Sequence, residues 1–292
     1  MTYECILYEQ HGPVVKITMN RPDVLNALSE QMVHEISAAL DQADEDPEVR
    51  AVILAGAGRS FCAGYDMKRE DTSGDNGPSA MDPESYEMEE YLRYWWERDG
   101  SHTDDLTHIW KLGVPVIAMV HGYCMGGGFW YSLACDITIA SDDAVFGQPE
   151  VRHVSNTTFL LAALTNWKHA HEWALTGDHM DAQHAEKLGI VNRVVPRDRL
   201  EEEAFRLAER ITLVPEPSVR INKAVTWRGL SAMGLTAAME VNAALSSIAH
   251  SSYGEHRKML NAAHQSGGLR AFLEARDGPF QPEPQGPRSR PR

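Results

Sequence analysis

Short apolar runs bounded by turn residues recur in the first half of this chain, and they alternate with stretches of helical spacing. Residues 13–20 (PVVKITMN) alternate apolar and polar side chains, as a half-buried strand does. Residues 50–56 (RAVILAG) form a continuous apolar run, which predicts a strand covered on both faces. PVIAMVHG (115–122) and DITIAS (136–141) predict two more strands, with a helix over 126–135 between them. This alternation predicts an α/β core with crossover connections.

A helix is predicted after the first of these strands. Ser29 has the side chain of an N-cap residue, and the apolar residues that follow it recur on one helical face. These residues are Met32, Val33, Ile36, Ala39 and Leu40. The acidic turn DEDPE (44–48) ends the predicted helix.

The strand and helix signals divide the chain into three parts. Residues 1–195 form the predicted α/β core, because the strand signals stop near Pro196. Residues 196–280 contain a series of helical patterns and predict a C-terminal helical subdomain. Residues 281–292 (QPEPQGPRSRPR) are polar and rich in proline, which predicts a disordered tail.

An acidic insertion interrupts the core at residues 70–108. Its first half contains Gly, Ser and Asp and predicts a mobile loop. Its second half places four aromatic residues close enough to line one face of a helix, namely Tyr91, Tyr94, Trp95 and Trp96. Two interpretations stay open: the aromatic side chains pack on the core or on a neighbouring subunit, or the segment closes as a lid over an apolar ligand.

Composition argues against several classes of protein. The chain of 292 residues is 43% hydrophobic with a net charge of −15, which supplies a core and disfavours binding to nucleic acid or an anionic membrane. It has no apolar run of membrane-spanning length and no signal-peptide pattern. Its four cysteines lack metal-ligand spacing and are too few for a disulfide scaffold. We therefore expect a cytoplasmic protein without a metal site.

Three consecutive glycines, Gly126 to Gly128, connect a predicted strand to a predicted helix. They lack the Lys-Ser/Thr of a P-loop and the spacing of a dinucleotide fingerprint. What remains is a helix start whose first N–H groups are uncovered. A second glycine turn, Ala63-Gly64, follows the strand at 50–56. The two loops can each direct one N–H at one oxygen, which predicts an oxyanion hole; glycines needed only for tight packing are the alternative.

Six motifs follow one another along the chain: SFCAGYDMK, VPVIAMVHGYCMGGG, ACDITIAS, AVFGQPE, ALTGDHMDAQHAEKLGIVNRVV and AFLEARDGPF. Their order and content resemble the enoyl-CoA hydratase/isomerase (crotonase) superfamily over about residues 5–280. The resemblance implies a crotonase-like α/β spiral of repeated β-β-α units with a C-terminal helical trimerisation region. It also implies an acyl-CoA substrate, no cofactor beyond the coenzyme A of that substrate, and a homotrimer or dimer of trimers.

The resemblance assigns the two oxyanion N–H groups to Tyr65 and Gly127. Three flanking residues with little or no side chain would let the backbone approach a thioester carbonyl: Ala63, Gly64 and Gly126. The enolate oxygen that forms from that carbonyl would accept hydrogen bonds from both N–H groups.

The segment after Tyr65 is expected to contact coenzyme A. Asp66, Met67 and Lys68 match the residues that wrap the adenine end of coenzyme A in the family. Lys68 and Arg69 are also placed to meet its phosphates, although exposed basic residues are usually only solvated.

One residue departs from the family pattern in a way that affects the chemistry. Hydratases of this family use two glutamates; Glu150 fills the second position, but Trp130 occupies the first and cannot transfer a proton. Glu150 alone can remove a proton beside the thioester and return it at another carbon, as the double-bond isomerases of the family do. Trp130 is then expected to be an aromatic wall for a bulky or cyclic acyl group, or core packing.

A second departure follows Glu150, where VRHVSNTTFLLAAL replaces the glycine- and proline-rich loop of the family. His153 is a candidate second acid or base, and Asn156 or Ser155 a candidate to position a water. The alternative is that Ser155, Asn156 or Thr157 caps the next helix.

Isomerisation of an enoyl-CoA is the leading prediction from these residues. The alternatives are an enoyl-CoA hydratase or acyl-CoA hydrolase with atypical water activation, and a coenzyme A-binding protein of the family without catalytic activity.

Overall fold

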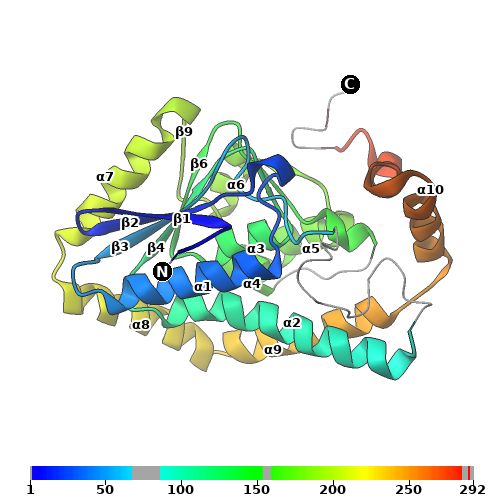
Figure 1. The fold of residues 1–292 in the computed structure, drawn as a ribbon, viewed down its shortest axis with the longest axis horizontal. Helices are drawn as coiled ribbons and strands as arrows, with labels where there is room; N and C mark the ends of the chain where they lie inside the picture. Colours follow the sequence, from blue (N-terminus) through cyan, green and yellow to red (C-terminus); the bar gives the residue numbers. More distant parts are fainter. Residues whose placement is uncertain (1, 68–85, 154–158, 285–288, 290–292) are drawn as a thin grey trace.

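A six-stranded sheet lies at the centre of the computed structural model, with helices on both faces (Figure 1). The structure describes residues 2–67, 86–153, 159–284 and 289. The strands are β1 Ile6–His11, β2 Val14–Met19, β3 Ala51–Gly56, β4 Val116–Val120, β5 Tyr123–Met125, β6 Ile137–Ser141, β7 Val145–Gly147, β8 Met180–Asp181 and β9 Arg193–Val195. The helices are α1 Glu30–Glu45, α2 Met88–Lys111, α3 Gly127–Ala134, α4 Phe159–Leu164, α5 Trp167–Thr176, α6 Ala182–Leu188, α7 Leu200–Thr212, α8 Glu216–Ala232, α9 Leu235–Ser251 and α10 Glu255–Asp277.

The large sheet has the strand order β1-β2-β3-β4-β6-β9, and only the β1–β2 pair is antiparallel. Successive side chains of a strand point to opposite faces. In β3, Ile53 therefore belongs to the core beneath α7, whereas Leu54 belongs to the core beneath α1, α2 and α3. A second sheet joins the short strands β5, β7 and β8.

The elements with clear local signals lie where the sequence predicts them. The predicted strands correspond to β2, β3, β4 and β6, and the predicted helix at 126–135 is α3. Ser29 caps α1, since its Oγ accepts a hydrogen bond from the N–H of Met32 at 3.2 Å. The α/β fold class with C-terminal helices is confirmed.

The other strands have no clear signal in the sequence. β1 is the edge strand and exposes most of its residues, so it lacks an apolar period. β5, β7 and β9 have three residues each and β8 has two, which is too short to show alternation. Tertiary pairing, rather than local pattern, fixes these strands.

Helices make up the described chain after β9. α9 lies along α2, and this contact buries part of the aromatic face predicted in the insertion (Figure 1). Tyr91 is buried, and the Trp95 ring stacks on His250 of α9 with centroids 3.8 Å apart. Residues 70–85 of the insertion lie outside the described residues. Within the described ranges, no helix has both the length and the apolar composition to cross a membrane.

The chain after α10 returns to the core. Glu283 lies in the segment predicted as a disordered tail, yet it is 1% exposed. Its carboxylate accepts a hydrogen bond from the N–H of His179 at 2.8 Å and pairs with Arg152 at 3.1 Å. Arg152, also buried, pairs with Asp178 at 2.9 Å and with Asp277 at 3.3 Å. Because buried charges need partners, this network fixes the chain as far as Glu283.

Candidate active site

Two backbone hydrogen bonds hold the loop after β3 beside Leu28. Leu28 donates its N–H to the carbonyl oxygen of Gly64 at 2.8 Å, and the N–H of Asp66 donates to the oxygen of Leu28 at 3.0 Å. In this parallel bridge Tyr65 stands between the two bonding residues, so its own N–H points away from Leu28. Among the described residues, no backbone acceptor binds the N–H of Tyr65 or of Gly127, the first residue of α3.

The glycine triplet packs directly against this loop. A Cβ atom on Gly127 would lie 2.6 Å from Cε2 of Tyr65, and one on Gly128 would lie 2.5 Å from Cβ of Cys62. Both distances are too short for real Cβ contacts, so both positions require glycine. Tight packing and an oxyanion site are therefore compatible, because the same packing brings together two N–H groups that have no backbone acceptor within the described ranges.

Two glycines also adopt backbone conformations that favour glycine. Gly64 has φ = 98° and Gly126 has φ = 51°. The Cβ position of Gly64 lies 3.5 Å from the nitrogen of Gly127, which places the two loops in contact. The N–H of Gly126 donates to the oxygen of Gly147 at 3.0 Å and links the triplet to the end of β7.

Glu150 lies beside the triplet because β7 ends at Gly147 and a proline turn follows it. Both carboxylate oxygens of Glu150 lie 3.3 Å from the Cβ position of Gly126. Burial raises the pKa of Glu150 to about 7, and the positive charge of Arg276 partly opposes this shift. The carboxyl group is thus able to take up and release a proton near neutral pH.

Trp130 and Tyr65 form an aromatic wall at the start of α3. The Trp130 ring meets Tyr65 edge-on, with centroids 6.0 Å apart. The Tyr65 ring also stacks on the ring of His102 in α2, with centroids 3.9 Å apart. Burial lowers the pKa of His102 to about 3, so this imidazole is neutral. Trp130 also packs against the main core, which is one of the two roles expected from the sequence.

A cavity of about 290 Å³ opens beside Tyr65, between α1 and α2. Its lining includes Leu28, Tyr65, Tyr94, His102 and Asp105. Burial raises the pKa of Asp105 to about 6. No local pattern in the sequence points to His102 or Asp105, because only the packing of α2 against α1 brings them to Tyr65.

His153 packs beneath the Glu150 turn. Its ring meets Phe272 of α10 edge-on at 5.0 Å, and neither ring nitrogen has a hydrogen-bond partner in the part of the chain that the structure describes. Burial, aided by nearby Arg276 and Arg257, lowers the pKa of His153 well below its ordinary value. The ring is therefore neutral and a weak base.

The segment expected to contact coenzyme A is only partly described. Asp66 forms an ion pair with Arg21 at 2.9 Å, and Met67 is exposed. Lys68 lies outside the described residues, as does Asn156 with its neighbours Ser155 and Thr157.

Asn26 is a positioning residue that the sequence analysis did not identify. Its buried side-chain amide donates to the backbone oxygens of Ala57, Ser60 and Phe61 at 2.8, 2.8 and 3.2 Å. The residue has φ = 55°, a conformation that asparagine tolerates better than most residues. It thereby fixes the approach to the Tyr65 loop. Residues 21–26 (RPDVLN) have the composition of a turn, but this pattern does not indicate what the side chain of Asn26 binds.

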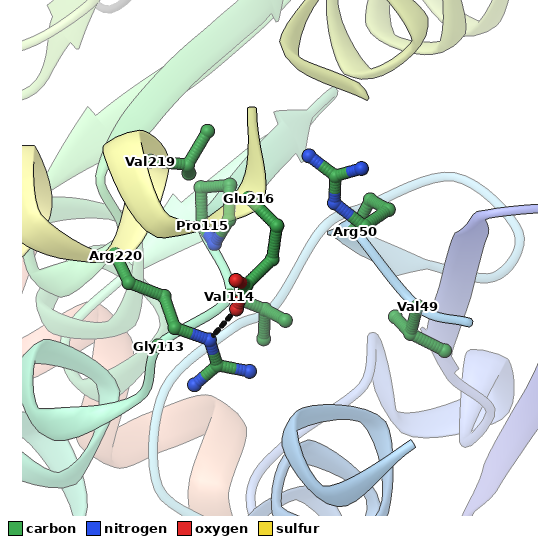
Figure 2. A pocket seen from close by; sticks show the side chains of 8 residues that line it. All are labelled: Val49, Arg50, Gly113, Val114, Pro115, Glu216, Val219 and Arg220. Atoms are coloured by element: carbon green, nitrogen blue, oxygen red, sulfur yellow. Dashed lines mark hydrogen bonds and ion pairs between the residues drawn. The ribbon is translucent and has the colours of Figure 1, made fainter. Parts of the chain in front are cut away.

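A second hollow lies where α8 meets the loop before β4 (Figure 2). Its volume is about 10 Å³, which leaves room for roughly one water. Glu216 and Arg220 of α8 form an ion pair at its wall, and Arg220 also pairs with Asp44 at 3.3 Å. The contact with Asp44 links α8 to α1, and the hollow is too small for a substrate.

Comparison with known proteins gives a consistent result along nearly the whole chain. The family model for enoyl-CoA hydratase/isomerase matches residues 9–283. The probable enoyl-CoA hydratase of Mycobacterium bovis is 33% identical over 290 residues, which cover 96% of this chain and 99% of that protein. The probable enoyl-CoA hydratase of Rhizobium meliloti is 36% identical over 235 residues, covering 79% of this chain and 84% of that protein.

The fold of the chain also matches that of a solved structure. The crystal structure of an enoyl-CoA hydratase/isomerase from Xanthobacter autotrophicus Py2 superposes with a TM-score of 0.85 at 34% identity. The match covers 96% of this chain and 99% of that one.

Proposed function

The chain belongs to the enoyl-CoA hydratase/isomerase family, and we propose that it moves a proton within an enoyl-CoA thioester with Glu150 as the base. In this proposal the N–H groups of Tyr65 and Gly127 bind the thioester oxygen. One observation carries the proposal: the Glu150 carboxylate lies 3.3 Å from the Cβ position of Gly126, directly before the glycine that would bind the oxygen.

The proposed reaction has two proton transfers. Glu150 takes a proton from the carbon next to the thioester carbonyl, or from the carbon at the far end of a double bond conjugated with it. The electron pair moves to the carbonyl oxygen. Two N–H donors stabilise the resulting enolate. The protonated Glu150 then returns the proton at another carbon, so the double bond moves and the carboxylate is restored. A pKa of about 7 suits both steps, since neither form of the group is strongly disfavoured.

We propose isomerisation ahead of hydration because of Trp130. Syn hydration in this family uses a second carboxylate at that position, and an indole cannot replace it in proton transfer. Hydration is the second candidate, since relatives of this chain carry the name enoyl-CoA hydratase. It requires another group to activate water; His153 is poorly suited because its strongly lowered pKa makes it a weak base.

Mass spectrometry in deuterated water tests the proposal. The protein is incubated with 2-enoyl-, 3-enoyl- and cyclic enoyl-CoA thioesters, and each product is analysed for deuterium, added water and free coenzyme A. Deuterium on carbon without added water is the expected result. A water adduct would establish hydration instead, and release of free coenzyme A would establish hydrolysis. An inert panel would favour a coenzyme A-binding protein without catalytic activity.

We also propose the remaining features that the family resemblance implies. The acyl-CoA is the only ligand the chemistry requires, because one carboxylate and two N–H donors supply the base and the oxyanion site. A metal or redox cofactor has no step to perform in this reaction. The chain is proposed to assemble as a homotrimer or dimer of trimers, in the cytoplasm.

A further inference from the structure

The orientation of the Glu150 carboxylate depends on the turn that carries it. Within the described ranges, the hydrogen bond to this carboxylate comes from the backbone N–H of Glu150 itself and from no other residue. The turn is the short 3₁₀ helix Pro149–Arg152, and the N–H of His153 donates to the oxygen of Glu150 at 3.0 Å. A carboxylate that no second side chain holds is directed by the backbone beneath it. Contacts that fix this turn therefore affect the proposed proton transfer.

Arg152 is the last residue of the turn, and its side chain is 1% exposed. Its guanidinium group donates hydrogen bonds from all three nitrogens. Nε donates to the oxygen of Thr176 at 2.8 Å, and Nη1 donates to Asp277 at 3.3 Å. Nη2 donates to Asp178 at 2.9 Å and to Glu283 at 3.1 Å. Because the planar group fixes the directions of these bonds, together they fix the position of Arg152.

The partners of Arg152 come from parts of the chain that are distant in sequence. Two acceptors lie at the end of α5, and a third is the last residue of α10. Glu283 and Phe280 belong to the segment after α10, and the Phe280 ring lies 4.1 Å from Cζ of Arg152. The turn also packs on the end of α5, since a Cβ atom on Gly177 would lie 3.0 Å from Cγ2 of Val151. The turn is thus held between α5 and the C-terminal segment.

We propose that Arg152 is a positioning residue for Glu150, and that the chain after α10 belongs to the active site through this contact. In this role Arg152 acts through the turn, which keeps the carboxylate beside Gly126. The inference rests on the proposed function, because it takes Glu150 to be the base. It adds that catalysis needs the segment up to Glu283, part of which the composition predicted to be a disordered tail.

Arg152→Lys tests this inference because it keeps the positive charge and loses the planar group. kcat is expected to fall by about 10- to 100-fold, since a shift of about 1 Å in a reacting group can have an effect of this size. Affinity for acyl-CoA should stay within about twofold, because the N–H groups of Tyr65 and Gly127 lie on other elements. Turnover in deuterated water and calorimetry measure the two quantities. Arg206→Lys, at a position more than half exposed, is the matched control and should behave as wild type.

Titration of Glu150 gives a second readout. The protein is labelled with ¹³C on its glutamate carboxyl groups, and the Glu150 resonance is identified by its absence from Glu150→Gln. Its midpoint in wild type should lie near pH 7. In Arg152→Lys the midpoint should fall towards the ordinary value of 4.5, because a loosened turn admits water to the carboxylate. The charges at residue 152 and at the nearby Arg276 are the same in both proteins, so charge does not explain such a shift.

A destabilised variant with an intact turn controls for a general loss of stability. Leu40→Ala removes buried apolar contacts beneath α1. It should keep the wild-type midpoint and a kcat within about twofold of wild type. Equal changes in Leu40→Ala and Arg152→Lys would overturn the inference. A folded Arg152→Lys protein with the wild-type kcat and midpoint would also overturn it.

Glu283→Gln tests the contribution of the C-terminal segment, and it decides the question if Arg152→Lys does not fold. The substitution keeps the size of the side chain and removes the charged partner of Arg152. kcat should fall by at least about threefold, with affinity for acyl-CoA unchanged. A wild-type kcat in this variant would exclude the segment after α10 from the active site.

The titration also separates this inference from the proposed reaction, because it needs no turnover. A lowered midpoint in Arg152→Lys, with a wild-type protein that is inert towards the enoyl-CoA panel, would support the positioning role and count against the reaction. Wild-type turnover with an unchanged kcat and midpoint in Arg152→Lys would support the reaction and refute the positioning role.

Discussion

At the scale of single residues, the carboxyl group of Glu150 is the one on which the proposed chemistry depends. Glu150→Gln keeps the shape of the side chain and removes the base, so turnover should fall by about 10²- to 10⁴-fold. Affinity for acyl-CoA should stay within about twofold, since the N–H donors are intact. Deuterium-exchange rates and calorimetry measure the two quantities. Glu48→Gln, at an exposed position, is the control and should behave as wild type.

The raised pKa of Glu150 gives a second residue-scale prediction. The base must be ionised in the free enzyme, so kcat/KM should rise with pH, be half-maximal near pH 7 and level off above it. Burial is the cause of the shift, because it disfavours the charged form. A profile that is already flat at pH values around 5 would contradict both the role and the environment assigned to Glu150.

Substitution of Gly127 tests how closely the site is packed. Gly127→Ala would place Cβ 2.6 Å from the Tyr65 ring, and the resulting overpacking should lower the free energy of unfolding by about 1–3 kcal/mol. Gly229→Ala is the matched control, because a Cβ there meets nothing within 4 Å and α8 should gain up to about 1 kcal/mol. Urea denaturation measures both. Equal effects of the two substitutions would show that the close packing around Gly127 is not rigid.

The sequence predicted some of these residues and missed others for a physical reason. Gly126 and Gly127 belong to a local glycine signal before α3, whereas Glu150 was predicted only from its place in the AVFGQPE motif of the family. The stacking of Tyr65 on His102 was not predictable, since it depends on how α2 packs. The place of Asp105 in the wall of the cavity between α1 and α2 was missed for the same reason.

At the scale of elements, β3 has a clear local signal in the sequence, whereas β5 has none. β3 is covered on both faces and shows an unbroken apolar run, so its sequence alone predicts it. β5 is only three residues long and exists because β7 pairs with it. The C-terminal segment is a further case: its proline-rich composition predicted disorder, but Glu283 is held by contacts with Arg152 and His179.

This C-terminal contact leads to a stability prediction. Glu283→Gln leaves the buried Arg152 with one fewer negative partner and should lower the free energy of unfolding at pH 7 by about 3 kcal/mol. Glu202→Gln is the control, since its pair with Arg199 is exposed and contributes less than about 1 kcal/mol. Urea denaturation measures the difference.

The pH dependence of that difference has a defined sign. Burial by itself would raise the pKa of Glu283, but hydrogen bonds from His179 and Arg152 outweigh it and lower this pKa to about 2, below its ordinary value of 4.5. A group with a lowered pKa stabilises the fold above its unfolded-state pKa and loses this contribution as pH falls towards the folded-state value. The gap between wild type and Glu283→Gln should therefore be full above about pH 4.5 and shrink towards pH 2. A gap that does not change with pH would contradict the ion-pair explanation.

At the scale of the whole molecule, the order of motifs along the chain predicted the family, and the match over residues 9–283 confirms it. Assembly into a trimer or a dimer of trimers stays a prediction that rests on the family resemblance. Sequence patterns do not distinguish an apolar side chain in the core from one on the surface. The fold does distinguish them: on α8 and α9, large apolar side chains remain exposed in the described chain.

These exposed side chains predict which face carries the proposed assembly. On α9, Val241, Leu245 and Ile248 recur at helical spacing on one face and are each more than half exposed. An apolar stripe of this kind marks an association surface. Light scattering should therefore give a mass of three or six times 32.5 kDa, and Leu245→Glu should reduce it, because burying the new charge opposes assembly. Leu7→Glu, at an exposed position of β1, is the control and should keep the wild-type mass. An unchanged mass for Leu245→Glu would exclude this face of α9 from the contact between subunits.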